Sequence, residues 1–247
     1  MTEQEQKEFL FKIDVKTLLD VTRTLKEFLK EARFNLNNEG LRITELEPAN
    51  VCLIDIELKK YLFIQLTEQQ EVKTYGININ WLYDALKENK KENVEITAQN
   101  NKLFLRFDNG INSEISLIEL EQESKKIPEL EFKTKIEINS KRLNEVLKHF
   151  CSNSESIVFN SLSDGFKVYS DKGFNDSEVK FNLDEVLISG EEVKSKYSTE
   201  YLKKFIKVIF SDKTFLEFDT GTPLKFEQVT GSLRVTYILA PRVETED

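Results

Sequence analysis

The sequence is poor in the residues that build linkers, disulfide scaffolds and metal sites. Its 247 residues include only 8 Gly, 4 Pro, 2 Cys and 1 His. So few Gly and Pro exclude a low-complexity or flexible Gly-rich tract, and we expect the chain to be folded except at its ends. Cys52 and Cys151 lie far apart beside apolar residues, which is typical of reduced packing residues rather than of a disulfide framework.

Long apolar runs are absent as well. No stretch of about 18 apolar residues is present to span a bilayer. The polar start, residues 1–6, lacks the basic and apolar regions of a signal peptide. The sequence therefore predicts a soluble, intracellular protein without a membrane segment.

Motifs for catalysis are also missing. The chain has no Gly-rich phosphate loop, no His-containing metal motif and no paired Cys spacing. His149 closes a basic helical segment, where a solvent-facing or packing role is commoner than that of a general base. With 44 Asp and Glu in the chain, adjacent pairs such as Glu191-Glu192 follow from composition alone. We expect neither an enzyme nor a bound metal or cofactor.

An internal repeat organises what is present. The run LFLRFDNG at residues 103–110 returns as TFLEFDTG at residues 214–221. Upstream of each copy lies a short amphipathic segment, at residues 81–87 and 201–207, with apolar residues at helical spacing. The second half of the sequence thus repeats the pattern of the first.

Earlier segments extend the repeat. Leu18 to Ala32 has the best helical pattern in the chain, and residues 143–150 are its counterpart. Hairpin signals follow each helix, at residues 34–43 and 157–168, and residues 51–58 and 233–239 alternate as strands do. The sequence predicts an α+β fold of two similar domains, residues 1–117 and 133–247, joined by a charged connector at 118–132.

Positive charge is concentrated in the predicted helices. Taken as residues 16–33, 80–93, 140–150 and 198–213, these helices carry 15 basic and 9 acidic residues, whereas the whole chain has a net charge of −9. Basic helices in an acidic molecule suit a surface that faces phosphate, although solvent-exposed helices are often rich in lysine. Four lysines fall at corresponding places in the repeat and would share one wall: Lys26, Lys87, Lys148 and Lys207.

Several short motifs carry a family resemblance. They are the C-terminal YILAPRVE at residues 237–244, the IPELEF at 127–132, the LEPANV at 46–51, Glu31-Ala32, and the TPL at 222–224. From about Phe11 to Glu244 the sequence resembles sliding clamps of the proliferating cell nuclear antigen type, found in archaea and eukaryotes. The motifs occur in the family's order over a duplicated chain.

The resemblance implies a trimeric ring of six similar domains. Helices would line its pore, antiparallel sheets would form the outside, and duplex DNA would pass through. Phosphate contacts of this kind do not depend on base sequence. Carried over by position, Lys26, Lys87, Lys148 and Lys207 would line the pore, and Lys30, Lys203 and Lys204 are further candidates from this sequence alone.

The resemblance also implies a partner groove beneath the connector. Client proteins, namely DNA polymerase, clamp loader, flap endonuclease and DNA ligase, would insert a short motif with one aliphatic and two aromatic side chains. Lys125 and Lys126 and the aliphatic Ile238 depart from the family pattern, and Leu46 and Ile238 could instead be ordinary core residues. The matching positions are Leu46, Ala49, Asn50, Ile127, Pro223, Ile238, Ala240 and Pro241.

Ring closure is the last feature that the resemblance implies. The strand at Asp108–Ser116 of one subunit would pair with Ser177–Leu183 of the next, through Ile111, Ile115, Val179 and Phe181. Complementary charge is scant there, with Asp108 and Glu114 facing Glu178 and Lys180, so a homotrimer and a heterotrimer both remain open.

We expect a non-catalytic processivity factor that encircles duplex DNA and tethers replication and repair proteins to it. The alternative is a specialised clamp paralogue in a heterotrimeric or damage-response ring. Its location would be the cytoplasm at the nucleoid in an archaeon, or the nucleus in a eukaryote.

Overall fold

The structure, a computed structural model, describes residues 7–120, 129–170 and 177–243. The chain forms two compact units, one from Met1–Pro48 and Asp55–Lys126, the other from Ala49–Ile54 and Ile127–Asp247. A short segment from the first half of the sequence, Ala49–Ile54, therefore belongs to the second unit. No helix among the described residues is long and apolar enough to cross a membrane.

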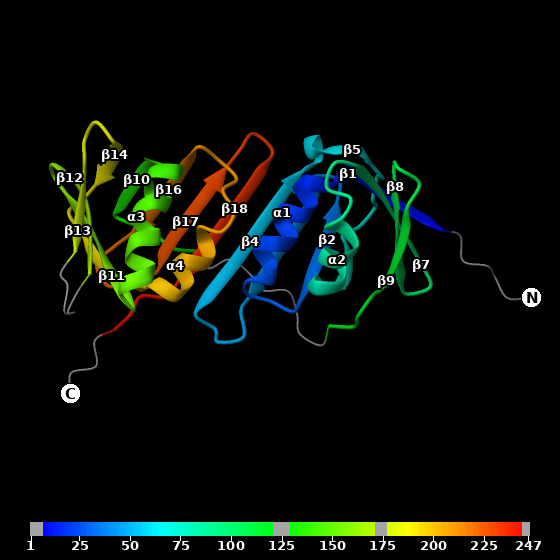
Figure 1. Cartoon of the computed structure of the whole chain (residues 1–247), viewed down its shortest axis with the longest axis horizontal. Coiled ribbons are helices and arrows are strands. Elements are labelled where there is room, and N and C mark those ends of the chain that lie inside the picture. The colour runs from blue at the N-terminus through cyan, green and yellow to red at the C-terminus, as the bar shows by residue number, and fades with distance from the viewer. Residues whose placement is uncertain (1–6, 121–128, 171–176, 244–247) are drawn as a thin grey trace, which may run out of the picture. The chain divides into compact units, whose positions relative to one another are not determined.

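Strands dominate both halves of the chain (Figure 1). The first half contains β1 (Glu8–Asp14), α1 (Val15–Lys26), β2 (Glu31–Asn37), β3 (Gly40–Leu46), β4 (Cys52–Lys59), η1 (Lys60–Leu62), β5 (Phe63–Leu66), β6 (Lys73–Asn78), α2 (Ile79–Leu86), β7 (Asn93–Gln99), β8 (Lys102–Phe107) and β9 (Asn112–Ser116). The second half contains β10 (Thr134–Asn139), α3 (Ser140–Asn153), β11 (Ser156–Leu162), β12 (Gly165–Ser170), β13 (Glu178–Asn182), β14 (Val186–Gly190), β15 (Lys194–Ser198), α4 (Thr199–Phe205), β16 (Lys213–Phe218), β17 (Leu224–Val229) and β18 (Leu233–Leu239).

The two halves share one topology. In the first, the strands run in the orders β5-β1-β7-β8-β9 and β4-β3-β2-β6. In the second, they run β14-β10-β16-β17-β18 and β13-β12-β11-β15. These orders are the same as in the first half when β1 is matched with β10, β2 with β11, and so on to β9 with β18. Neighbouring strands pair antiparallel within each unit. The predicted α+β fold with antiparallel sheets is confirmed.

One part of the predicted repeat was out of register. The segment at residues 103–110 contains β8, the second strand after α2, whereas residues 214–221 contain β16, the first strand after α4. The true counterpart of β8 is β17. Alternating apolar residues that end in a turn are common to many strands, so the similarity of these two segments could not identify which strands correspond.

The helices also differ from their predicted lengths. α1 ends at Lys26 rather than at residue 33, because Glu31 and Ala32 already pair with β6 as part of β2. Phe28 and Leu29 are buried without being helical, and their burial made the apolar pattern look longer than the helix. α2 and α4 likewise stop several residues early, whereas α3 runs three residues beyond its predicted end.

The two predicted hairpins are confirmed and use the same turn. Asn37 pairs with Gly40 between β2 and β3, and Leu162 pairs with Gly165 between β11 and β12. Both glycines have positive φ, +133° and +152°. A Cβ at Gly40 would lie 1.9 Å from the carbonyl oxygen of Leu58, so only glycine fits this close approach.

Each unit has its own hydrophobic core beneath its helix pair. In the first unit the buried residues are mainly aliphatic, such as Leu18, Val21 and Leu25 on α1. The second unit packs aromatic rings edge to face, with Phe159 contacting Phe166 and Tyr197 at centroid distances of 5.3 and 5.5 Å. Within each unit the two helices pack against each other (Figure 1). Most of the exposed residues on these helices are polar or charged.

The start of α1 depends on a side-chain cap. The Asp14 carboxylate accepts hydrogen bonds from the Thr17 amide at 2.8 Å and from the Thr17 hydroxyl at 3.0 Å. Replacing Asp14 by Ala should lower the free energy of unfolding by about 1 kcal/mol, because an orphan amide at the helix start loses its partner. Urea unfolding monitored by circular dichroism measures this, and Asp14→Asn, which keeps a capping oxygen, should lose much less.

Candidate functional site

In the first unit the predicted lysines meet at one end of the helix pair. Lys26 is the last residue of α1 and Lys87 directly follows α2, and both are exposed. The Lys26 ammonium lies 4.2 Å from the centroid of the Tyr83 ring, and the Lys87 ammonium lies 2.8 Å from Oδ1 of Asp84. Tyr83 and Asp84, neighbours on α2, therefore link the two lysines into one cluster.

The charges in this cluster influence each other. The hydrogen bond from Lys87 lowers the pKa of the Asp84 carboxyl below its usual value, and Lys26 acts in the same direction. The same hydrogen bond raises the pKa of Lys87. Asp84 and Lys87 are therefore both charged near neutral pH. Trp81, one turn before Asp84 on α2, is 48% exposed.

In the second unit the predicted lysines are also exposed. Lys148 lies within α3, and Lys207 follows the end of α4. Of the further candidates, Lys30 and Lys203 are exposed, while Lys204 lies 3.3 Å from Glu200 and 4.7 Å from the Tyr201 ring centroid.

The observed helices keep the predicted sign of charge. Their four spans contain 8 Lys and Arg and 4 Asp and Glu, a net charge of +4 in a chain whose total is −9. Because the apolar side chains of these helices point into the cores, the charged ones lie at the surface. Each unit thus presents a lysine-bearing helix face to solvent, which can attract phosphate without reading bases.

The second unit brings several predicted groove residues together. The backbone N–H of Ala240 donates to the carbonyl of Val51 at 2.9 Å, which holds the exposed pair Ala49-Asn50 next to the C-terminal segment. Asn50 adopts a φ of +60°. Pro223, Ala240 and Pro241 are each partly exposed, as a docking surface for an apolar side chain requires.

The other groove candidates are not among these exposed residues of the second unit. Ile238 is only 8% exposed, and Leu46 of the first unit is partly exposed. Ile127, like Lys125 and Lys126 and most of the predicted connector, lies outside the described residues.

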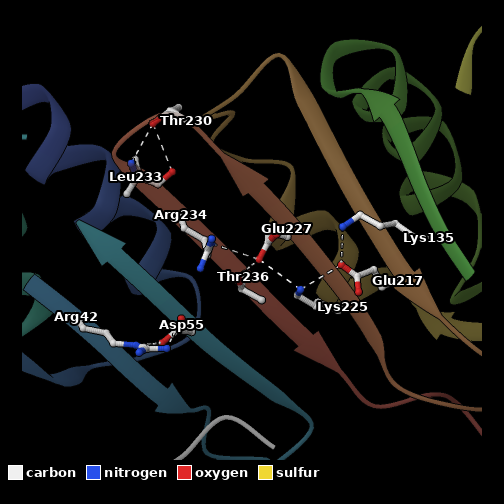
Figure 2. Close-up of polar contacts among 10 residues, drawn as sticks. All are labelled: Arg42, Asp55, Lys135, Glu217, Lys225, Glu227, Thr230, Leu233, Arg234 and Thr236. Carbon is white, nitrogen blue, oxygen red and sulfur yellow. Dashed lines mark hydrogen bonds and ion pairs between the residues drawn. The ribbon is translucent and has the colours of Figure 1, made fainter. Parts of the chain in front are cut away.

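A chain of ion pairs beside Ile238 was not predicted from the sequence. Lys225 pairs with Ile238 in register across β17 and β18, and its ammonium lies 3.2 Å from Glu217 and 3.6 Å from Glu227. Figure 2 shows how Lys135 and Arg234 extend this chain at its two ends, at 3.3 and 3.7 Å from their partners. In the sequence, this chain of ion pairs is indicated by alternating positive and negative residues on neighbouring strands, because pairing of the strands places opposite charges next to each other.

The first unit has a separate ion pair in Figure 2. Arg42 Nε donates to Asp55 at 2.9 Å, and Thr44 also donates to this carboxylate, at 2.6 Å. The hydrogen bond to Asp55 raises the pKa of Arg42. This pair stabilises the charge of the buried Asp55 and joins β3 to β4.

The strands predicted to close a ring are both sheet edges within their units. β9 ends the five-stranded order of the first unit, and β13 ends the four-stranded order of the second. Ile111 is 49% exposed and Val179 is partly exposed, whereas Ile115 and Phe181 are buried. The Phe181 ring stacks on Phe166 in the core of its own unit, so only its backbone is available to another chain.

Charges on these edges are paired within their own units. Glu114 lies 2.7 Å from Lys102, Lys180 bonds Asp164, and Glu178 bonds Lys167. Asp108 likewise accepts from Lys12 and Asn93, which lowers its pKa. The scarcity of complementary charge noted in the sequence therefore does not leave these groups without partners.

Potential catalytic groups are dispersed in the described part of the chain. His149 is exposed on α3. Within residues 7–120, 129–170 and 177–243, no three His, Cys, Asp or Glu side chains gather as a metal site would need. Burial raises the pKa of the Cys151 thiol to about 11, which makes it a poor nucleophile near neutral pH.

Comparison with known proteins places the chain among replication proteins. The family described as "Proliferating cell nuclear antigen, N-terminal domain" matches residues 11–128. The DNA polymerase sliding clamp of Archaeoglobus fulgidus is 30% identical over 237 residues, which cover 93% of this chain and 96% of the relative. The clamp of Thermoplasma acidophilum is 32% identical over 244 residues, covering 94% and 98%.

Solved structures agree with these relatives. A structure described as the C-terminal region of FEN-1 bound to A. fulgidus PCNA matches with a TM-score of 0.89 at 27% identity, covering 96% of this chain and all of that one. The PCNA of Entamoeba histolytica, at 18% identity and the same TM-score, shares the fold. The chain therefore belongs to the DNA polymerase sliding clamp family, that of proliferating cell nuclear antigen, and functions as a DNA sliding clamp.

Proposed function

We propose that the chain is one subunit of a trimeric ring that encircles duplex DNA and tethers other proteins to it without catalysing a reaction. The observation that carries this proposal is the pair of exposed, basic helix faces, repeated in both units of an otherwise acidic chain. Such faces attract phosphate, and the acidic remainder repels DNA elsewhere. The relatives named above give no support to the alternative of a specialised paralogue.

Four lysines would touch phosphates in this ring: Lys26, Lys87, Lys148 and Lys207. All four are exposed, and each lies on a helix or within two residues of its end. Lysine holds its charge as a point on a flexible stem, so such contacts break and reform easily as the ring slides. The ring would act wherever the chromosome lies, at the nucleoid of an archaeon or in the nucleus of a eukaryote.

Client proteins would dock at the surface formed by Ala49, Asn50, Pro223, Ala240 and Pro241. Four of these residues are apolar, and all five are at least partly exposed, which suits an extended peptide with apolar anchors. The structure of a related clamp bound to the C-terminal region of FEN-1 supports a flap endonuclease as one client. DNA polymerase, clamp loader and DNA ligase would share the site, with Ile127 and Ile238 completing it.

The ring would close by pairing β9 of one subunit with β13 of the next. Because charges on both strands are already paired internally, backbone hydrogen bonds and Ile111 and Val179 would carry this contact. A homotrimer needs no complementary charge in this arrangement. Light scattering of the purified chain, alone and with paralogues, distinguishes a homotrimer from a heterotrimer.

Encirclement has a direct test. After loading onto a nicked plasmid with clamp loader and ATP, the chain should stay on the circle through a high-salt wash, since a closed ring is held by topology. Cutting the plasmid once should release it, because the ring can slide off an end. Gel filtration measures the bound fraction; retention on the cut plasmid, or loss from the circle at high salt, would contradict the proposal.

A further inference from the structure

The two helix pairs are alike in topology but unlike in charge. Counted from α1 and from α2 through Lys87, the first unit's pair has a net charge of +2. Counted from α3 and from α4 through Lys207, the second unit's pair has +4. Much of this difference lies at one repeat position, where the first unit has Asp84 and the second has Lys204.

Asp84 occupies a position where it competes with DNA. It lies between Lys87, which it bonds at 2.8 Å, and Tyr83, whose ring holds Lys26 at 4.2 Å. The carboxylate and both lysines are exposed, so a phosphate that approaches either lysine also approaches a negative charge. Asp84 occupies one of the three N–H donors of Lys87, and its negative charge offsets part of the attraction of that lysine for a phosphate.

At the equivalent position of the second unit the sequence has a lysine in place of the carboxylate. Lys204 stands there, and its ion pair is made with Glu200 at the start of α4, a full turn earlier. Glu200 is already included in the net charge of +4. Lys203 and Lys207 are exposed on the same element or just beyond it.

We infer that Asp84 holds Lys87 as an internal counterion, so that the second unit's helix pair supplies the larger share of the attraction to DNA. The inference rests on the proposed role of these helices in facing DNA. Asp84 thereby acts as a residue that weakens binding, which favours sliding over tight association. The lowered pKa of Asp84 agrees with its being charged when DNA arrives.

Replacing Asp84 by Asn should therefore strengthen binding. We expect about threefold tighter binding to a linear duplex at moderate salt, since one nearby negative charge is removed and Lys87 is released. The slope of log affinity against log salt should steepen by about 0.9 for each Lys87 that gains a phosphate. Fluorescence anisotropy of a labelled duplex across a salt series measures both quantities.

Glu95→Gln is the matched control. Glu95 lies 2.8 Å from Arg106 in the same unit, so this variant also removes one negative charge from an ion pair of equal length. It lies on β7 between the buried Val94 and Ile96, and its side chain therefore points to the face opposite the core. The two variants share the loss of one carboxylate from an ion pair, but only Asp84→Asn removes that charge from beside Lys87 and Lys26.

Two double variants compare the units. Replacing Lys148 and Lys207 by Ala should weaken binding at least twice as much as replacing Lys26 and Lys87. In a background that carries Asp84→Lys with Lys204→Asp, which leaves the net charge unchanged, this order should reverse.

The outcomes separate the inference from the proposed function. If the lysine variants weaken binding but Asp84→Asn matches Glu95→Gln, or if both lysine pairs cost the same, the inference is wrong and the DNA-facing role stands. If neither lysine pair affects binding in a correctly sized ring, the DNA-facing role is wrong and the inference falls with it.

Discussion

Replacing Lys26, Lys87, Lys148 and Lys207 together by Ala is expected to reduce clamp-stimulated DNA synthesis at least tenfold at moderate salt. Each single replacement should cost only about two- to threefold, because screened phosphate attraction is a sum over many lysines. The fourfold variant should also depend less on salt, since fewer counterions are displaced when it meets DNA. Primer extension by the cognate polymerase across a salt series measures both effects.

Folding should survive this change. The four lysines are exposed, and Ala is the best helix former, although Lys26, Lys87 and Lys207 near helix C-termini give up a small favourable interaction with the helix dipole. The same four positions changed to Arg should keep most activity, because the charge remains. A fourfold Ala variant that forms the ring and matches the parent at every salt concentration would show that these helices do not face DNA.

Replacing Pro241 by Asp should weaken binding of a flap endonuclease C-terminal peptide at least tenfold. A charge in an apolar docking surface has no partner once the peptide covers it, which costs on the order of a few kcal/mol. Ile127→Asp should act in the same direction. Isothermal titration with the peptide measures the affinity, and light scattering checks that assembly is unchanged.

Ile64→Asp provides the control for this experiment. Ile64 is 58% exposed on β5 of the first unit, outside the proposed groove, so the change adds the same charge at an exposed apolar position. Its peptide affinity should equal that of the parent. Unchanged affinity in both Pro241→Asp and Ile127→Asp would mean that the client site lies elsewhere.

Local signals in the sequence were sufficient for the hairpins and for the exposed lysines. The turn at Gly40 and its counterpart at Gly165 require a conformation that only glycine adopts freely, so the sequence marks them directly. The exposure of Lys26 and Lys148 was predictable because apolar residues at helical spacing show which face of a helix is buried and which faces solvent.

Longer-range features could not be read in this way. The end of α1 is set by pairing of Glu31 and Ala32 with a strand more than forty residues away, and no local pattern contains that partner. Phe181 looks like an available apolar residue on an edge strand, yet it fills a core beside Phe166. The Asp84–Lys87 pair is local, but the position of Lys26 beside Tyr83 could not be predicted, because the fold brings that lysine from another helix.

Trp81 gives the first unit an optical property that the second lacks. It is the only tryptophan in the chain, and it lies 48% exposed on α2, one turn from Asp84. Its fluorescence emission therefore changes only with the solvent exposure of α2. The corresponding helix α4 carries Tyr201, which does not fluoresce when tryptophan is excited selectively. In the proposed ring, unlabelled protein would thus reveal when DNA reaches the first unit.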